Sequence, residues 1–205
     1  MNDIEKLAEY FIKFPGIGRR QAKRFVYFLL KQDVNFRREI SNTILKLGEN
    51  TEQCGSCFRY FPKNGSSECA ICKNIERDAS KLLVLEKDSD LETVHSSGIY
   101  DGMYFILGGL IPITKKGGQE YIRTQKLISK IVEKIEAGEL KEVILGLSVN
   151  PDGEHTRILL QNEIERATEG SVSVSILGRG LSTGTELEYS DTETLKNALE
   201  TRTKK

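Results

Sequence analysis

The sequence lacks any apolar run close to the ~18 residues that a transmembrane helix needs, and no apolar signal segment follows Met1. Its opening residues, 2–6, read instead as the start of an amphipathic helix. We therefore expect a protein that does not associate with a membrane and is not secreted. Its expected location is the cytoplasm.

The chain also lacks net charge, because 30 Lys and Arg balance 30 Asp and Glu. The charges are nevertheless unevenly placed: residues 1–77 carry an excess of five positive charges and residues 78–205 an excess of five negative ones. Most of the basic excess lies between Lys13 and Arg38. A solvated helix face is the simplest explanation of such a run of basic residues. Whether the run instead binds a ligand depends on the structural elements that carry it.

Cysteine is scarce, with four in the whole chain and all of them between residues 54 and 72. They form two CxxC pairs separated by eleven residues, a spacing typical of a tetrahedral zinc site: Cys54, Cys57, Cys69 and Cys72. Two disulfides are the alternative, but these are rare in cytosolic proteins. We predict one zinc ion per chain. Four protein ligands leave no open position, so its role should be structural and not catalytic.

The basic region predicts two helices joined by a tight turn. The first should end near Phe14 and the second should span residues 19–31, with Pro15-Gly16-Ile17-Gly18 between them. Two glycines one residue apart allow a sharp bend and a close approach to a ligand, and the next helix starts with free amide groups. The pattern resembles the helix-hairpin-helix motif of sequence-independent DNA-binding proteins; an ordinary αα-corner is the alternative. Because four cations stand in the first six residues of the second helix, we favour DNA binding, and the residues expected to contact DNA are Gly16, Gly18, Arg19, Arg20, Lys23 and Arg24.

Between this region and the second cysteine pair we expect a third helix and a hairpin. Apolar residues at helical spacing run from Phe36 to Leu47, and Gly48 is the expected C-cap. The segment Pro62-Lys63-Asn64-Gly65 is typical of a turn, which predicts a short hairpin with a metal knuckle at each end.

From residue 81 onward, short apolar runs alternate with helical patterns. Strands are expected at residues 82–85, 104–107, 143–147 and 172–177, and helices at 127–135, 156–167 and, after a capping box, 190–199. This alternation predicts a mostly parallel sheet covered on both faces, with ligands beyond the carboxyl ends of its strands.

Acidic residues follow two of these strands: Glu86 after the first, and Asp152 and Glu154 after the third. This arrangement resembles the TOPRIM domain of topoisomerases and primases, in which such acids bind magnesium. The alternative is that the acids only cap helices or keep loops soluble.

In their order and spacing these pieces resemble the RecR family of bacterial recombination mediators over essentially the whole chain. Further matching segments are Tyr104-Phe105-Ile106-Leu107-Gly108-Gly109 and the stretch at 187–191, which is Walker-B-like although no Walker A loop accompanies it. The resemblance implies a multidomain α+β or α/β fold. Its segments would be a helix-hairpin-helix domain at 1–52, a four-cysteine zinc finger at 53–77, a TOPRIM domain at 78–177 and a C-terminal segment at 178–205.

The resemblance also implies a non-enzymatic function in recombinational DNA repair. Such a protein forms a ring-like homo-oligomer, a tetramer or a dimer, and binds single- and double-stranded DNA without sequence preference. It acts with RecO and RecF to load RecA on single strands. The family's DNA-contacting cations match Arg20 and Arg24. Its TOPRIM acids match Glu86, Asp152 and Glu154, and are expected to contact RecO and not to catalyse.

Two other functions stay open on the sequence alone. A magnesium-dependent TOPRIM nuclease or primase would use the same three acids, but it needs converging carboxylates and a base or nucleophile. The two histidines, His95 and His155, lie in no recognised catalytic pattern. A zinc-ribbon module that binds a protein or RNA would explain the cysteines alone. We therefore predict no catalytic residues.

Overall fold

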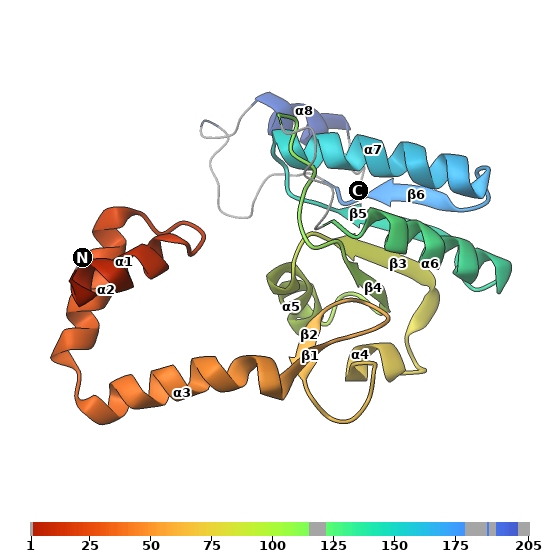
Figure 1. The fold of residues 1–205 in the computed structure, drawn as a ribbon. Helices are drawn as coiled ribbons and strands as arrows, with labels where there is room; N and C mark the ends of the chain where they lie inside the picture. Colours follow the sequence, from red (N-terminus) through yellow and green to blue (C-terminus); the bar gives the residue numbers. More distant parts are fainter. Residues whose placement is uncertain (1, 115–121, 179–187, 189–191, 201–205) are drawn as a thin grey trace. The chain divides into compact units, whose positions relative to one another are not determined.

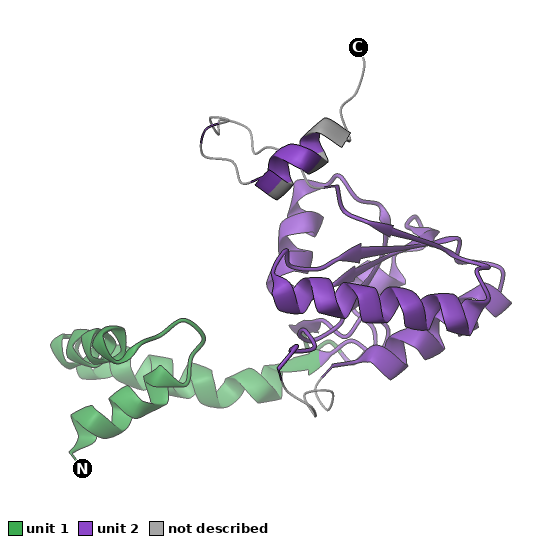
Figure 2. Ribbon diagram, turned by 90° about the horizontal axis from the view of Figure 1, so that it is seen from above, with its two compact units in different colours: residues 1–52, 62–64 green, residues 53–61, 65–205 purple. Residues whose placement is uncertain are grey.

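The computed structural model describes residues 2–114, 122–178, 188 and 192–200, and it divides the chain into two compact units (Figure 2). Unit 1 comprises residues 1–52 and 62–64, and unit 2 comprises residues 53–61 and 65–205. Both cysteine pairs and the sheet thus belong to the same unit. The division into four segments suggested by the sequence stays a prediction.

Unit 1 consists of three helices, α1 (Asp3–Ile12), α2 (Arg19–Lys31) and α3 (Val34–Asn50) (Figure 1). The bounds of α2 are those predicted from the sequence. The Asn2 side chain accepts a hydrogen bond from the Glu5 amide and so caps α1, while Asp33 accepts from the amides of Asn35 and Phe36 and caps α3. Each cap satisfies donors that the first turn of a helix leaves free.

The predicted C-cap at Gly48 is wrong. Helix α3 continues through Gly48 to Asn50, and Thr51 is its C-cap in an extended conformation. The Thr51 hydroxyl donates to the Leu47 carbonyl, 2.5 Å away, and satisfies one of the carbonyls that the last turn leaves free. The helix therefore ends where the chain enters its first strand, and the glycine has no part in ending it.

The core of unit 1 is very small. Its buried apolar residues are Ala8, Ala22 and Val26, with Ile4, Phe11 and Ile17 packed against them. Helix α3 buries no residue at all. Many large apolar side chains of this unit are consequently exposed, among them Phe14, Tyr27, Phe28, Leu30, Ile44, Leu45 and Leu47.

A short hairpin is present around the first cysteine pair. Strands β1 (Thr51–Gln53) and β2 (Tyr60–Pro62) pair with each other, and the loop between them carries Cys54 and Cys57. The turn predicted at residues 62–65 therefore does not close this hairpin; it leads on to the second pair. Cys69 is the N-cap of the four-residue helix α4 (Ala70–Lys73).

Four parallel strands form the sheet of unit 2, in the order β4-β3-β5-β6 (Figure 1). They are β3 (Asp78–Leu85), β4 (Gly102–Ile106), β5 (Glu142–Gly146) and β6 (Ser173–Ile176). All four predicted strands are present. Strand β3 starts earlier than expected, and its register with β4 shifts between Asp78 and Leu82.

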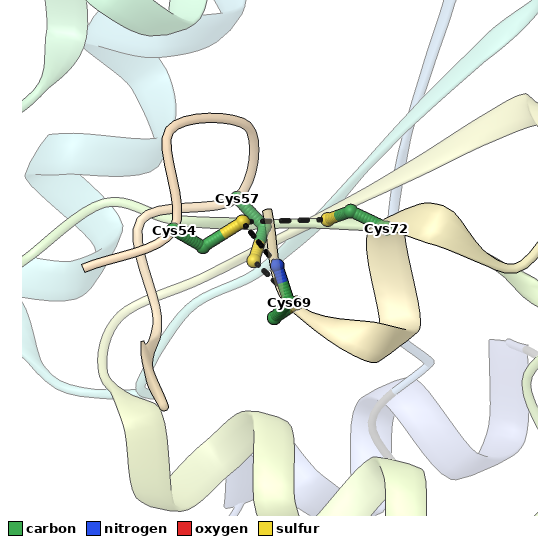
Figure 3. Close-up of side chains that lie close together, drawn as sticks. All are labelled: Cys54, Cys57, Cys69 and Cys72. Atoms are coloured by element: carbon green, nitrogen blue, oxygen red, sulfur yellow. Dashed lines mark hydrogen bonds between the residues drawn. The ribbon is translucent and has the colours of Figure 1, made fainter. Parts of the chain in front are cut away.

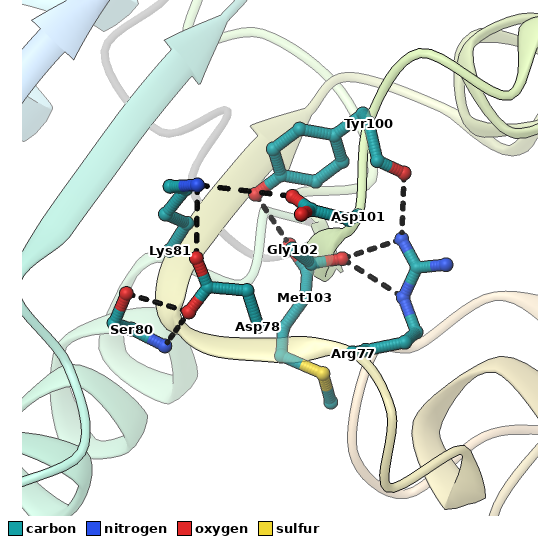
Figure 4. A network of polar contacts seen from close by, with 8 residues as sticks. All are labelled: Arg77, Asp78, Ser80, Lys81, Tyr100, Asp101, Gly102 and Met103. Carbon is teal, nitrogen blue, oxygen red and sulfur yellow. Dashed lines mark hydrogen bonds and ion pairs between the residues drawn. The ribbon is translucent and has the colours of Figure 1, made fainter.

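Side chains fix this early start of β3 against β4 (Figure 4). The Arg77 guanidinium donates to the carbonyl oxygens of Gly102, at 2.6 and 2.9 Å, and of Tyr100, at 3.1 Å. The Asp78 carboxylate accepts from the Ser80 hydroxyl and pairs with Lys81 at 2.9 Å. The Arg77 bonds thus join the two segments where the shift interrupts the regular ladder, and the Asp78 contacts order the start of β3 itself.

Both faces of the sheet are covered, as predicted. Along β3, Leu82 and Val84 join the core under helices α6 (Thr124–Glu136) and α7 (Pro151–Thr168), whereas Leu83 and Leu85 join a second core. That second core contains Leu91 of helix α5 (Asp88–Ser97) together with Cys54, Cys57 and Cys69. The cysteine module thus forms part of the layer that covers this face.

The last two helices differ from their predicted bounds. Helix α7 begins at Pro151 and not at Thr156, because Asn150 caps it by accepting from the Gly153 amide at 2.8 Å. Helix α8 (Thr192–Glu200) is present, but the first two residues of its predicted capping box and, except for Glu188, the Walker-B-like stretch at 187–191 lie outside the described residues. No helix in the described ranges is long and apolar enough to cross a membrane.

Candidate metal centre and nucleic-acid interface

The four cysteines converge on one point, as the sequence predicts (Figure 3). Their sulfur atoms all lie within 4.8 Å of one another; Cys54 and Cys72 are 3.8 Å apart and Cys57 and Cys69 are 3.7 Å apart. Cys54, Cys57 and Cys69 are buried and Cys72 is partly buried. Across the described ranges this is the one group of at least three Cys, His, Asp or Glu side chains close enough to share a metal ion.

These distances fit a tetrahedral thiolate site. Metal–sulfur bonds of about 2.3 Å place the four sulfurs about 3.8 Å apart, whereas a disulfide needs about 2.05 Å. The cysteines are accordingly not paired in disulfides. The hydrogen bond between Cys57 and Cys69 raises the pKa of the Cys57 thiol and lowers that of Cys69. Thiolates this close repel one another, and a cation between them would offset that repulsion, so the set is suited to binding a metal.

The loop that carries the first pair is attached to the sheet. The Ile106 amide of edge strand β4 donates to the Cys57 carbonyl at 2.8 Å. Phe58, which has a left-handed φ of 64°, packs its ring on Phe105 with a centroid separation of 5.1 Å. Lys130 of α6 donates to the Ser56 carbonyl at 2.6 Å and to its hydroxyl at 2.7 Å. Sequence reasoning missed both Phe58 and Lys130, because nothing local in the sequence indicates these distant contacts.

The hairpin between α1 and α2 is a tight turn closed by the Ile17 amide, which donates to the Phe14 carbonyl at 3.1 Å. Gly16 has a φ of +74°, a conformation that a side chain makes costly. Gly18 is different: its φ of −84° suits any residue, and a Cβ at this position would meet no atom within 4 Å. The fold therefore requires the first glycine but does not require the second.

Gly18 is the N-cap of α2, and no side chain caps this helix end. The first amides of α2 are thus available to an acceptor outside the helix. Four exposed cations follow within the first two turns of α2: Arg19, Arg20, Lys23 and Arg24. The Arg24 guanidinium donates a hydrogen bond to the Gln21 side chain at 3.2 Å. The geometry fits a phosphate that approaches the backbone at Gly18 and is flanked by positive charge. The DNA contacts themselves stay a prediction.

The three acids lie near the carboxyl ends of β3 and β5, but each binds a different protein group. Glu86 accepts a short hydrogen bond from the Ser148 hydroxyl. Asp152 accepts from the Ile113 amide at 3.0 Å. Glu154 pairs with Arg157. Asp152 and Glu154 stand in the first turn of α7 and not in a loop.

Gly153, between these two acids, is required by packing. A Cβ here would lie 1.9 Å from the carbonyl oxygen of Ser148, a backbone atom that cannot move aside easily. The glycine of the acid-Gly-acid sequence therefore allows the start of α7 to pack against the end of β5.

An open pocket lies beside these acids and is lined by Asp90, Ser148, Glu154 and Arg157 together with the ends of β5 and β6. Burial raises the pKa of the Asp90 carboxyl, and the charge of nearby Glu86 adds to the effect. The position of Asp90 in this pocket was not predicted from the sequence.

Comparisons with known proteins agree with this architecture. A family model described as the Toprim domain matches residues 81–177, and one described as the RecR C-terminal region matches residues 180–203. The chain is 34% identical to the recombination protein RecR of Bacteroides thetaiotaomicron over 98% of its length and 93% of that protein's. It is 35% identical to the recombination protein RecR of Prochlorococcus marinus MIT 9312, over 98% and 96% respectively.

Proposed function

The chain belongs to the RecR family of recombination proteins, and on that premise we propose that it is a non-enzymatic DNA clamp that helps RecO and RecF to load RecA on single strands. Its relatives are named as recombination proteins, so a role in recombination and DNA repair follows from the family. The clamp mechanism, the partner proteins and the cytoplasmic location are our proposal.

The exposed amide end of α2 and its four cations carry the proposed DNA binding. Backbone amides and arginine side chains bind phosphate oxygens without reading the bases, which suits a protein that must bind any sequence. Single- and double-stranded DNA share this backbone chemistry. The bound strand would contact Gly16, Gly18, Arg19, Arg20, Lys23 and Arg24.

Self-association is supported by the small core of unit 1. A unit that buries three residues and exposes aromatic and aliphatic side chains on α2 and α3 gains stability when a second copy covers them. We propose a ring of identical chains, because one chain of this size cannot encircle a duplex. Mass measured in solution with and without DNA tests this directly, and a strict monomer under both conditions would contradict it.

We propose that the metal is zinc, one per chain, with a structural role. The four thiolates and their spacing match the closed tetrahedral sites in which zinc has no exchangeable position. Metal analysis of protein purified without added zinc should give close to one zinc per chain.

The acids Glu86, Asp152 and Glu154 are proposed to bind RecO. Support comes from their separate hydrogen bonds to Ser148, Ile113 and Arg157, which leave them as a polar surface in place of a converging magnesium set. The rival function, a magnesium-dependent nuclease or primase, is tested by DNA cleavage and primer synthesis with Mg²⁺. If the wild-type protein cleaves DNA or makes primers and Glu86→Gln abolishes that activity, our proposal is overturned. Loss of RecO binding in Glu86→Gln would support it.

The DNA proposal is tested with Arg20→Ala and Arg24→Ala. Each should weaken binding about equally for all sequences and lower the slope of log affinity against log salt by about 0.9 for each duplex phosphate that the variant no longer binds. Lys46→Ala is the matched control, because Lys46 is an exposed cation on α3, away from the hairpin sequence. Unchanged affinity and slope in both arginine variants would contradict the proposal.

A further inference from the structure

The metal centre has a charge that its own ligands cannot balance. A divalent ion with four thiolates leaves an excess of two negative charges. Three of the four cysteines are buried, so water cannot fully compensate this charge, and an uncompensated buried charge is costly. A cation placed at the loop that carries the ligands would stabilise the loaded centre.

Lys130 occupies such a position. Its ammonium group donates to both the carbonyl and the hydroxyl of Ser56, and Ser56 stands between the ligands Cys54 and Cys57. The side chain is partly buried. Burial lowers the pKa of Lys130, while the negative charge of Cys72, Cys57 and Cys54 opposes that change, so the charges of the cluster reach this ammonium group.

The same contact joins α6 to the metal loop. Helix α6 packs with Leu127 and Ile131 in the core of one sheet face, whereas the cysteines belong to the core of the other. Phe58 packs against both cores, next to β4 at the edge of the sheet. Lys130 therefore extends from the α6 layer, past the β4 edge of the sheet, to a loop whose cysteines belong to the opposite layer.

We propose that Lys130 is an outer-sphere residue of the metal centre, whose positive charge and hydrogen bonds to Ser56 keep the ion bound. The inference rests on the proposed zinc ion and concerns a residue that contacts no ligand sulfur. Outer-sphere groups that fix the ligands of a metal commonly change its affinity by about 10- to 100-fold.

The experiment measures how fast the full-length protein releases zinc to a chromogenic chelator at neutral pH. Lys130→Met should release zinc about 10-fold faster or more, and Lys130→Arg, which keeps the charge, should stay near the wild-type rate. Lys134→Met is the matched control: Lys134 is one turn further along α6 and pairs with Glu139 at 2.5 Å. Lys130→Gln is measured in parallel and replaces the Met variant if that one does not fold.

A second readout separates charge from packing. In protein loaded with Co²⁺, removal of a nearby positive charge raises the energy of the sulfur electrons. The sulfur-to-cobalt absorption should then move to longer wavelength in Lys130→Met and stay in place in Lys134→Met. If Lys130→Met releases zinc within twofold of the wild-type rate and its sulfur-to-cobalt absorption does not move, the inference is overturned. A wild-type protein without bound zinc would instead overturn the proposed zinc ion, so the two failures are distinguishable.

Discussion

The backbone amide of Ile106 donates to the carbonyl of Cys57, with 2.8 Å between nitrogen and oxygen. Ile106 ends the edge strand β4, and Cys57 belongs to the four-cysteine cluster, so the loop that carries Cys57 covers the end of an edge that the sheet would otherwise expose. Cys54, Cys57 and Cys69 also share a core with Leu83 and Leu85 of β3. The metal centre is therefore built into the sheet unit and does not form a separate appendage.

The first prediction concerns loss of the metal. Cys69 is buried and its amide donates to the Cys54 sulfur at 3.3 Å, so Cys69→Ser should lose the ion and open the layer that covers one face of the sheet. We expect ~3 kcal/mol or more of destabilisation, as for other losses of a structural metal. Chemical denaturation of wild type, chelated wild type and Cys69→Ser checks this. A chelated protein as stable as the loaded one would contradict it.

The second prediction separates the two hairpin glycines. Gly16→Ala should destabilise unit 1 by about 1–2 kcal/mol, because alanine is unfavourable at a φ of +74°. Gly18→Ala should leave stability unchanged, since its φ is ordinary and nothing lies within 4 Å of the new Cβ. It should nevertheless weaken DNA binding, because the methyl group keeps a phosphate away from the α2 amides. Thermal melts and DNA titrations of both variants test this, and full DNA affinity in Gly18→Ala would argue against phosphate binding there.

Features with a local cause could be predicted from the sequence. Helix α2 follows from its apolar spacing and the Pro15–Gly18 turn, and the convergence of the four cysteines follows from two CxxC pairs. The C-cap predicted at Gly48 was wrong: glycine often ends a helix, but α3 ends where the chain enters β1. The contact between Lys130 and Ser56 spans 74 residues and depends on how α6 packs, so no local pattern could indicate it.

A third prediction concerns Gly153. Alanine at this position would place its Cβ 1.9 Å from the Ser148 carbonyl oxygen, so the start of α7 must move away from the end of β5. We expect a loss of about 1–3 kcal/mol, the usual effect of overpacking, measured by urea denaturation. Gly178→Ala is a suitable control, because a Cβ there meets nothing within 4 Å. Equal stability of the two variants would show that the clash is relieved without cost.

A fourth prediction compares two tyrosines, Tyr100 and Tyr104, whose rings make an edge-to-face contact with centroids 5.2 Å apart. The buried hydroxyl of Tyr104 has no hydrogen-bond partner among the described residues, whereas that of Tyr100 donates to the Met103 carbonyl at 3.2 Å. Tyr104→Phe should therefore leave stability unchanged or raise it. Tyr100→Phe should lower it by about 1 kcal/mol. Equilibrium unfolding of both variants tests this. A larger loss of stability in Tyr104→Phe than in Tyr100→Phe would contradict the prediction that only the Tyr100 hydroxyl makes a stabilising hydrogen bond.

The fifth prediction concerns acid sensitivity at Asp78. A hydrogen bond from the Ser80 hydroxyl and then the contact with Lys81 hold the pKa of this carboxyl well below its ordinary value of about 3.9. A carboxyl whose pKa is lowered by folding stabilises the protein above that ordinary value, and this contribution is lost as the pH falls toward the folded-state pKa.

Asp78→Asn should accordingly be less stable than wild type at pH 7, and the difference should shrink as the pH falls below ~4. Because Asp78 and Lys81 are partly exposed, the difference should also shrink in high salt. Asp101→Asn is the comparison: Asp101 is 3.8 Å from the same ammonium group and should matter less. Urea midpoints measured between pH 7 and pH 3 test this, and a difference that grows toward low pH would contradict the assigned sign.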